Sequence, residues 1–335
     1  MEKNKITVIG AGSWGCALAR ILGDNGHEVM IYDVDVASVK EINEHHTNRA
    51  KLKEGVLPLC VNATTDLKVA CNFADNILLV VPTKVTRSVL VEINSIIKSK
   101  KLFINASKGI EPATFKRISE IVYEVIDNKY IDGFVALTGP SHAEEVIVQN
   151  LTTVAAASEN EEHAKYVQEL FSNNTYFRVY RVNDLIGAEL GGSLKNIYAI
   201  AAGMCEAMGY GVNAKAALIT RGLAEMKRLA VSMGAKEETL NGLTGVGDLI
   251  VTCTSMLSRN YLAGMQIAAG MSLYQTLGNI PMVVEGARTC ESAYHAARKY
   301  GVETPIIDAI YNVIYNQKDP KIEVMNFLSR DLKEE

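Results

Sequence analysis

The sequence predicts an α/β amino-terminal domain with a mostly parallel sheet, followed by an all-α carboxy-terminal domain. Up to about residue 183, short apolar runs rich in β-branched residues alternate with helix-length segments, a rhythm typical of βαβ units. Beyond that point Ala, Leu, Met and Gly dominate, and no comparable run recurs. The 335 residues, 48% of them hydrophobic, suffice for two domains. We expect these domains to cover residues 1–187 and 188–335.

Each element follows from its local pattern. Strands are predicted where apolar runs are short, at residues 5–9, 29–32, 77–81, 102–105, 134–137 and 153–157. Helices are predicted between them at 14–22, 83–98, 114–126 and 161–171, and two long buried helices follow at 185–208 and 214–233. The glycine-rich stretch 242–247 is predicted to be a functional loop.

Composition limits the partners and the compartment. The net charge is −4, from 34 basic and 38 acidic residues without long runs, so no nucleic-acid or anionic-membrane surface is indicated. A small-molecule substrate is the better expectation. The six cysteines are widely separated and form no C-x-x-C motif, which predicts reduced thiols rather than disulfides or a metal site. No secretory or membrane-spanning pattern is present, and we expect a cytoplasmic protein without membrane insertion.

A glycine motif, Gly10-Ala11-Gly12-Ser13-Trp14-Gly15, lies between the first predicted strand and the first predicted helix. Gly10 would allow a tight turn, Gly12 a close approach of the backbone to a pyrophosphate, and Gly15 close packing of helix on strand. The helix amino terminus would offer N–H groups to that anion. An ordinary glycine-rich turn is the alternative, but this context predicts a dinucleotide-binding Rossmann domain.

Asp33 stands at the end of the second predicted strand, about 20 residues after the glycine motif, where such domains carry a ribose-binding carboxylate. A carboxylate there accepts hydrogen bonds from a ribose 2′-hydroxyl and repels a 2′-phosphate. The sequence thus predicts a preference for NADH over NADPH. Asp35 is close enough to take the same role, and a solvated turn aspartate is the alternative for either residue.

Lys195 is the candidate for exchanging a proton with an alcohol or carbonyl oxygen. The residues that follow it, 197–203, are almost all apolar, so we expect its amine to be buried. Burial favours the neutral amine, which can accept a proton. The alternative is a lysine that extends its amine to solvent at a helix surface. Arg221 is also a lone charge in an apolar helix. A structural ion pair is at least as plausible for it as a catalytic role, and no chemistry is assigned to it.

Two polar clusters further along suit a phosphorylated polyol. Asp248 ends a Gly-x-Gly-Asp motif, and Ser258, Arg259 and Asn260 follow on a second segment that is predicted, like the first, to be loop-like. Arginine offers a fork of donors to phosphate, and an aspartate can accept a substrate hydroxyl or orient a lysine. Taken singly, Ser258 could equally be a helix N-cap and Asp248 an ordinary loop residue.

Lys108 and the segment from Gly139 through Ser141 to Ala143 each follow a predicted strand. Ligands of open parallel sheets bind beyond the carboxyl ends of the strands, so Lys108 could meet a phosphate or the cofactor, or be an exposed loop lysine. His142 in the same segment is interpreted as structural. Cys253 has no histidine partner in its motif and is interpreted as a packing residue.

These motifs together resemble the bacterial-type NAD(P)-dependent glycerol-3-phosphate dehydrogenase family, from residue 5 to about residue 325. The resemblance is carried by residues 10–15, 81–84, 107–112, 139–145, 191–196, 213–221, 242–248, 252–255, 258–260 and 284–286. It implies a Rossmann domain plus an all-helical domain. The implied reaction is reversible reduction of dihydroxyacetone phosphate to sn-glycerol 3-phosphate, a precursor of glycerophospholipids, with Lys195 as the proton acceptor in the oxidative direction.

The resemblance also assigns binding residues. Those implied at the NAD(P)H cofactor, besides the glycines, are Ser13, Trp14, Lys108, Ala143, Arg259, Val283 and Glu285. Those implied at the substrate are Lys108, Gly139, Ser141, Lys195, Asp248, Ser258, Arg259 and Asn260. No metal is implied.

Two departures concern the adenosine end of the cofactor. Relatives often carry basic residues just after the second strand, where this chain has Asp33, Val34 and Asp35, and segment 49–55 departs from the family's Tyr-Leu-Pro-like pattern. Both weaken an expectation of NADPH use. Two other functions are considered: a phosphogluconate or β-hydroxyacid dehydrogenase, and a non-catalytic NAD(H) sensor. The extensive apolar helical half predicts a homodimer.

Overall fold

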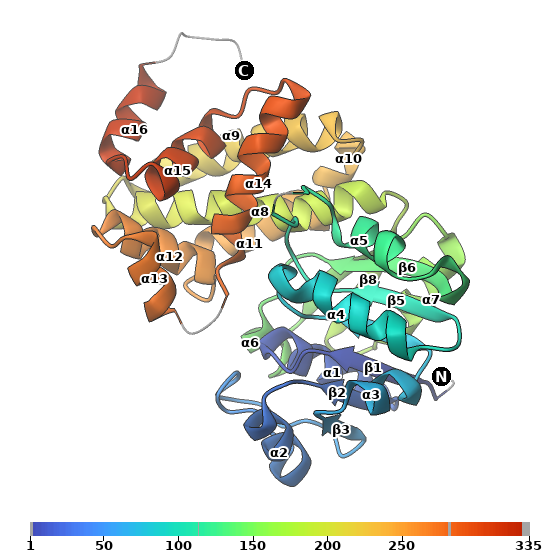
Figure 1. Cartoon of the computed structure of the whole chain (residues 1–335). Helices are drawn as coiled ribbons and strands as arrows, with labels where there is room; N and C mark the ends of the chain where they lie inside the picture. The colour runs from blue at the N-terminus through green and yellow to red at the C-terminus, as the bar shows by residue number, and fades with distance from the viewer. Residues whose placement is uncertain (1–2, 113, 281–282, 330–335) are drawn as a thin grey trace. The chain divides into compact units, whose positions relative to one another are not determined.

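The computed structural model describes residues 3–112, 114–280 and 283–329, and the chain divides into two compact units. The first unit comprises Met1–Lys108 and Lys116–Glu189, and the second comprises Gly109–Phe115 and Leu190–Glu335. In Figure 1 the first unit runs from blue to green and holds the sheet, and the part of the second unit from Leu190 onward, in yellow-green to red, is helical. An α/β fold followed by an all-α part is thereby confirmed.

The first unit is built on one eight-stranded sheet with the order β3-β2-β1-β4-β5-β6-β7-β8. The strands are β1 (Lys5–Ile9), β2 (Glu28–Tyr32), β3 (Val61–Thr64), β4 (Asn76–Leu79), β5 (Lys101–Asn105), β6 (Ile131–Thr138), β7 (Thr152–Ala157) and β8 (Phe177–Val182). Neighbouring strands are parallel except for β6 and β7, which are antiparallel. The carboxyl ends of β1, β2, β4 and β5 therefore lie along one edge of the sheet.

All six predicted strands are present, but the sequence analysis missed β3 and β8, which form the two edges of the sheet. Edge strands need not be uniformly apolar, because one side of the strand faces no neighbour. β3 has only four residues and includes the exposed Asn62, and β8 alternates buried apolar residues with exposed Arg178 and Tyr180. Neither segment contains the continuous apolar run that identifies an interior parallel strand.

Helices cover both faces of this sheet. On one face α1 (Ser13–Asp24) packs with α6 (Ala143–Val146) and α7 (Glu161–Phe171), and on the other α3 (Leu67–Phe73), α4 (Thr83–Ile96) and α5 (Ile118–Val125) pack in series. The side chains of β1 point to both faces of the sheet. Ile6 and Val8 lie in the hydrophobic core under α1, here called the α1 core, and Ile9 lies in the core on the opposite face, under α3. The remaining helix, α2 (Val36–His45), leads from β2 toward β3.

The second unit is built around α8 (Leu185–Ala207), which is buried continuously from residue 187 to residue 204. A helix that is apolar on all sides is typical of a core helix, as predicted. Helices α9 (Gly211–Ser232), α10 (Glu237–Leu240), α11 (Asp248–Thr254), α12 (Arg259–Ala268), α13 (Leu273–Asn279), α14 (Glu285–Tyr300), α15 (Pro305–Tyr315) and α16 (Pro320–Leu328) complete it. The prediction that α9 is buried was wrong for most of its length, since only one stripe ending at Ala230 is buried.

Helices α8 and α12 cross with no side chains between them. A Cβ atom on Gly203 of α8 would lie 1.9 Å from the carbonyl oxygen of Tyr261, and one on Gly264 of α12 would lie 1.9 Å from that of Ile200. Only hydrogen atoms fit in those spaces. The two backbones are therefore in direct contact.

The glycine-rich stretch 242–247 is not the loop that was predicted. Residues Leu243–Gly247 form a π-helical turn, η2, which continues directly into α11. A Cβ on Gly245 would lie 2.0 Å from the carbonyl oxygen of Leu240, so this glycine allows the turn to pack closely against the end of α10. For the same reason Asp248 lies in the first turn of a helix and not in a loop.

The six cysteines are free thiols, in agreement with the predicted absence of a disulfide framework. Within residues 3–112, 114–280 and 283–329, no helix combines the length and the apolar character that crossing a membrane requires.

Candidate active site

The glycine motif forms the turn between β1 and α1. Gly10 has φ +117°, a conformation that favours glycine, and a Cβ there would lie 2.9 Å from the carbonyl oxygen of Val80. A Cβ on Gly15 would lie 2.0 Å from the carbonyl oxygen of Gly10. The first glycine thus permits the turn and the third lets the helix pack against it.

Gly12 differs from the other two, because no described atom lies within 4 Å of where its Cβ would be. It is the N-cap of α1 and, as a glycine, brings no side chain to cap this helix end. The positive end of the helix dipole therefore faces an open position to which the backbone permits close approach. These features fit the pyrophosphate of a dinucleotide.

Asp33 lies directly after β2 and joins its end to the glycine motif. Its Oδ2 accepts a hydrogen bond from the backbone N–H of Ala11 at 2.6 Å, and its Oδ1 accepts one from the N–H of Asp35 at 2.9 Å. Asp35, the alternative ribose ligand, caps α2 by accepting hydrogen bonds from the Ser38 hydroxyl at 2.8 Å and the Ala37 N–H at 3.1 Å. Its bond with the Ser38 hydroxyl lowers the pKa of Asp35.

The other residues of the first unit implied at the cofactor lie on α1 and α6. Ser13 is buried and its hydroxyl donates to the carbonyl oxygen of Lys51 at 2.9 Å. Trp14 packs against the α1 core, and its buried indole N–H has no hydrogen-bond acceptor among the described residues. Ala143 is buried at the start of α6, which packs on α1.

Lys108, Gly139 and Ser141 come together beyond the ends of β5 and β6. The Lys108 Nζ donates to the Gly139 carbonyl oxygen at 3.3 Å, and the Ser141 hydroxyl donates to the same oxygen at 2.9 Å. Gly139 has φ +140°, and a Cβ there would lie 3.0 Å from the Cα of Val154. An ammonium and a hydroxyl are thereby held at the carboxyl edge of the sheet, where open α/β sheets bind ligands.

Lys195 on α8 forms a buried ion pair with Asp248 on α11. The Nζ lies 2.5 Å from the Asp248 Oδ1, and the two residues are 5% and 0% exposed. The predicted burial of this lysine is confirmed, and the alternative of an amine extended to solvent is wrong. Desolvation strengthens the attraction between these charges and opposes their separation.

The sequence places this pair through two local features. A Cβ on Gly191 of α8 would lie 2.3 Å from the carbonyl oxygen of Thr244, so η2 lies directly against α8, one turn before Lys195. Thr252, one turn after Asp248 on α11, accepts a hydrogen bond from the Lys195 Nζ at 2.7 Å. Thr252 was not among the site residues predicted from the sequence. Its i, i+4 spacing from Asp248 is the signal that would have identified it once α11 was recognised as a helix.

The Ser258, Arg259 and Asn260 segment opens α12. Ser258 is buried and is the N-cap that the alternative interpretation expected, since its Oγ accepts from the Tyr261 N–H at 3.2 Å. The Asn260 side chain donates to Asn196 Oδ1 at 2.9 Å and accepts from the Gly286 N–H at 2.9 Å. This side chain thus links α12 to the start of α14, where Glu285 is the first residue and Val283 lies two residues before it.

Cys253 lies beside the ion pair but is not a candidate nucleophile. Burial raises the pKa of its thiol to about 12. A thiol with such a pKa is not ionised near neutral pH, and the thiolate is the nucleophilic form. The interpretation of Cys253 as a packing residue agrees with this environment.

Comparison with known proteins gives the same family over both parts of the chain. Residues 5–164 match the amino-terminal part, and residues 184–325 the carboxy-terminal part, of the NAD-dependent glycerol-3-phosphate dehydrogenases. The chain belongs to the NAD-dependent glycerol-3-phosphate dehydrogenase family. The predicted membership is confirmed, and so is the predicted enzyme class, an NAD(P)-dependent oxidoreductase that acts on a CH–OH group.

Individual relatives cover nearly the whole of this dehydrogenase. Proteins named glycerol-3-phosphate dehydrogenase (NAD(P)+) are 50% identical in Staphylococcus haemolyticus, over 99% of both chains, and 51% identical in Enterococcus faecalis, over 99% of this chain and 98% of the relative. The crystal structure of the glycerol-3-phosphate dehydrogenase from Coxiella burnetii is 34% identical, with a TM-score of 0.93, over 98% of this chain and 99% of the other.

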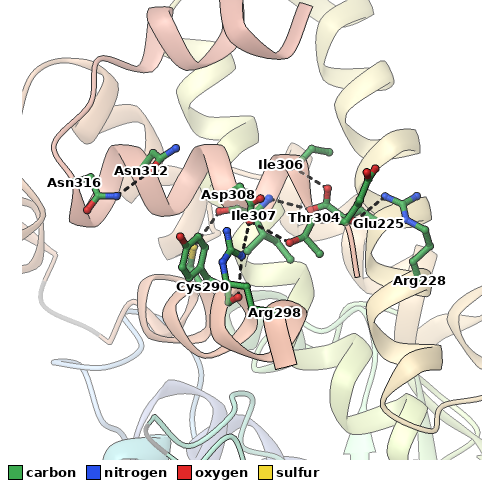
Figure 2. Close-up of polar contacts among 12 residues, drawn as sticks. Glu225, Arg228, Cys290, Arg298, Thr304, Ile306, Ile307, Asp308, Asn312 and Asn316 are labelled. Atoms are coloured by element: carbon green, nitrogen blue, oxygen red, sulfur yellow. Dashed lines mark hydrogen bonds and ion pairs between the residues drawn. The ribbon is translucent and has the colours of Figure 1, made fainter. Parts of the chain in front are cut away.

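Glu225 on α9 is another buried acidic residue of the dehydrogenase, and it was not predicted from the sequence. Its two carboxylate oxygens accept hydrogen bonds from the backbone N–H groups of Ile306 and Ile307, each at 2.9 Å (Figure 2). These are orphan donors of the first turn of α15, which its own N-cap residue, Thr304, does not cap with its side chain. Glu225 is thus a remote cap of α15. The lone charge that the sequence analysis considered on α9, Arg221, lies one turn earlier and is exposed.

Protonation of Glu225 should make stability depend on pH. Burial raises its pKa to about 7, against the opposing effect of the two backbone hydrogen bonds. Between the unfolded pKa near 4.5 and about 7, the folded state holds a proton that the unfolded state has lost, so stability falls as pH rises through this window. We expect Glu225 to contribute a decrease of roughly 3 kcal/mol in the free energy of unfolding across that window.

Urea denaturation at intervals from pH 5 to pH 8 measures this decrease. In Glu225→Gln the slope should become shallower, whatever the absolute stability of the variant, because the amide does not titrate. Glu189 is buried and also has a raised pKa, so the comparison uses the difference between the two proteins. Parallel curves for wild type and variant would show that Glu225 does not titrate in this range.

Proposed function

We propose that the chain catalyses reversible hydride transfer between NAD(P)H and dihydroxyacetone phosphate, giving sn-glycerol 3-phosphate for glycerophospholipid synthesis in the cytoplasm. The observation that carries the proposal is the buried Lys195–Asp248 pair, at 2.5 Å, in a chain whose glycine motif fits a dinucleotide. The names of the relatives support the choice of substrate.

Lys195 is proposed as the proton donor and acceptor. A bound nicotinamide cofactor supplies or takes up the hydride at the substrate carbon. In the reduction, the Lys195 ammonium gives one proton to the carbonyl oxygen as that oxygen becomes a hydroxyl; in the oxidation, the neutral amine takes the proton back. Asp248 and Thr252 hold the Nζ in place at 2.5 and 2.7 Å. A general acid must be held in this way to reach one atom of the substrate.

The remaining assignments concern binding. An arginine and a lysine are suited to a phosphate, Arg259 through a planar fork of donors and Lys108 as a compact charge. We propose as substrate ligands Lys108, Gly139, Ser141, Lys195, Asp248, Ser258, Arg259 and Asn260. We propose as cofactor ligands Gly10, Gly12, Ser13, Trp14, Gly15, Asp33, Lys108, Ala143, Arg259, Val283 and Glu285. The homodimer that the sequence suggests remains a prediction.

NADH is the proposed preferred cofactor. Asp33 and Asp35 place two carboxylates at the end of β2, where a 2′-phosphate would meet like charge. Each oxygen of Asp33 accepts one backbone hydrogen bond and keeps a lone pair for a ribose hydroxyl. We expect kcat/KM to be higher for NADH than for NADPH; a clear preference for NADPH would exclude this role of Asp33.

The function is tested by following NADH oxidation spectrophotometrically with dihydroxyacetone phosphate, and cofactor reduction with 6-phosphogluconate and with β-hydroxyacids. We expect turnover with dihydroxyacetone phosphate alone. Turnover with one of the other substrates instead would identify a different lysine-using dehydrogenase. Binding of NADH without turnover of any of these substrates would favour the alternative function of a non-catalytic NAD(H) sensor.

A further inference from the structure

The segment between α2 and β3 is fastened to the glycine motif by side-chain hydrogen bonds. The Asn48 amide donates to the carbonyl oxygen of Ala11 at 2.9 Å, and the Ser13 hydroxyl donates to the carbonyl oxygen of Lys51 at 2.9 Å. The Ser38 hydroxyl lies 2.8 Å from Asp35 Oδ2 and 3.4 Å from Asn48 Oδ1, which connects the segment to the turn after β2. The backbone of Lys51 is therefore held beside the start of α1.

Negative charges outnumber positive charges around the backbone of Lys51. Asp33 and Asp35 contribute two carboxylates, and the Lys51 ammonium is close enough to Asp35 to contribute to lowering the pKa of that carboxyl. Lys51 is half-buried, and its ammonium makes no hydrogen bond or ion pair with the residues that the structure describes. By contrast, the Arg49 guanidinium donates a hydrogen bond to the Lys53 carbonyl oxygen, and the Arg49 backbone N–H donates one to the Glu41 carboxylate.

We propose that Lys51 is a cofactor-specificity residue, whose ammonium offsets the carboxylates after β2 and accepts the 2′-phosphate of NADPH. This proposal rests on the proposed dinucleotide site. A basic side chain near the ribose accommodates a 2′-phosphate in Rossmann domains, and here that charge comes from the segment after α2 instead of the residues directly after β2. Lys51 thus permits use of NADPH by a site that Asp33 biases toward NADH.

The matched pair of variants is Lys51→Ala and Lys53→Ala. Both remove one positive charge from the same segment, but Lys53 is exposed and only its backbone carbonyl has a described contact. The bond that Ser13 makes to residue 51 uses the backbone carbonyl and survives in Lys51→Ala. Any difference between the variants therefore reports the position of the ammonium.

Calorimetric titration with 2′,5′-ADP and with 5′-AMP measures the adenosine end alone. We expect Lys51→Ala to bind 2′,5′-ADP roughly tenfold more weakly than wild type, as for loss of one charge-assisted contact, with 5′-AMP binding unchanged. The ratio of kcat/KM for NADPH to that for NADH should fall by a similar factor. Lys53→Ala should match wild type in all of these measurements.

If Lys51→Ala bound 5′-AMP and 2′,5′-ADP with equally reduced affinity, Lys51 would have a structural role and the proposal would be overturned. Unchanged affinity for both nucleotides would also overturn it. A wild-type chain that binds 5′-AMP but not 2′,5′-ADP would also overturn it, leaving the proposed dehydrogenase function intact. If the wild-type chain bound neither nucleotide nor NADH, the proposed function itself would fail.

Discussion

Lys195→Ala is expected to lower kcat by about 10²- to 10⁴-fold, the range for loss of a general acid–base group. The amine is the only group that the proposal assigns to proton exchange with the substrate oxygen. Asp248 cannot replace it, because the Asp248 side chain accepts hydrogen bonds from the lysine and is fully buried. NADH binding should persist, since the glycine motif is distant in the sequence and untouched by the change.

The control variant Lys195→Arg keeps a positive charge beside Asp248 but removes the amine that exchanges a proton with the substrate. A guanidinium can keep an ion pair with Asp248 but does not release its proton at any working pH. We expect this variant to be as impaired in kcat as Lys195→Ala and to remain closer to wild type in stability. Steady-state kinetics with dihydroxyacetone phosphate, with NADH binding followed by fluorescence, checks both results. Near-normal turnover of either variant would remove Lys195 from the chemistry.

Asp248→Ala is expected to lower the free energy of unfolding by about 3–5 kcal/mol, because it leaves the Lys195 ammonium buried without its carboxylate. The pair lies at 2.5 Å with neither residue more than 5% exposed, so solvent cannot replace the lost partner. Thr252 offers the amine a neutral oxygen at 2.7 Å, which does not compensate a charge. Urea denaturation monitored by circular dichroism measures the change.

The matched comparison is the double variant Lys195→Met with Asp248→Leu. Replacing both members of a buried ion pair by apolar residues is often neutral or stabilising, so the double variant should be more stable than Asp248→Ala. If it were instead less stable by the sum of the single effects, the pair would not be coupled. The kinetics of all variants are compared at a temperature at which circular dichroism shows every protein folded.

The sequence predicted well those parts of the fold that depend on local patterns. Interior parallel strands are continuously apolar, and the glycine motif has a fixed relation to the strand before it and the helix after it, so both could be recognised without the structure. The burial of Lys195 followed in the same way from its apolar helix. The edge strands β3 and β8 lack that continuous pattern and were missed.

The partners within the site could not be predicted, because they depend on contacts between residues far apart in the chain. Asp248 was singled out, but it was expected on a loop, and nothing in its motif shows that it lies on the first turn of a helix against α8. Glu225 was missed altogether, since its role is to accept hydrogen bonds from a helix that begins 80 residues later. The glycine-rich stretch 242–247 was predicted to be a functional loop, whereas here it forms a π-helical turn in which Gly245 allows close packing.

The direct contact of α8 and α12 at Gly203 and Gly264 limits the substitutions that these two helices can accept at their crossing point. Lys195 projects from one of the two backbones, and the other begins with Arg259, so the contact sets the spacing between the proposed proton-transfer group and a proposed phosphate ligand. Side chains normally form an adjustable layer between helices that can absorb substitutions by repacking. Without that layer, a methyl group at either glycine must displace a whole helix. Two residues with no functional groups therefore govern the geometry of the proposed chemistry.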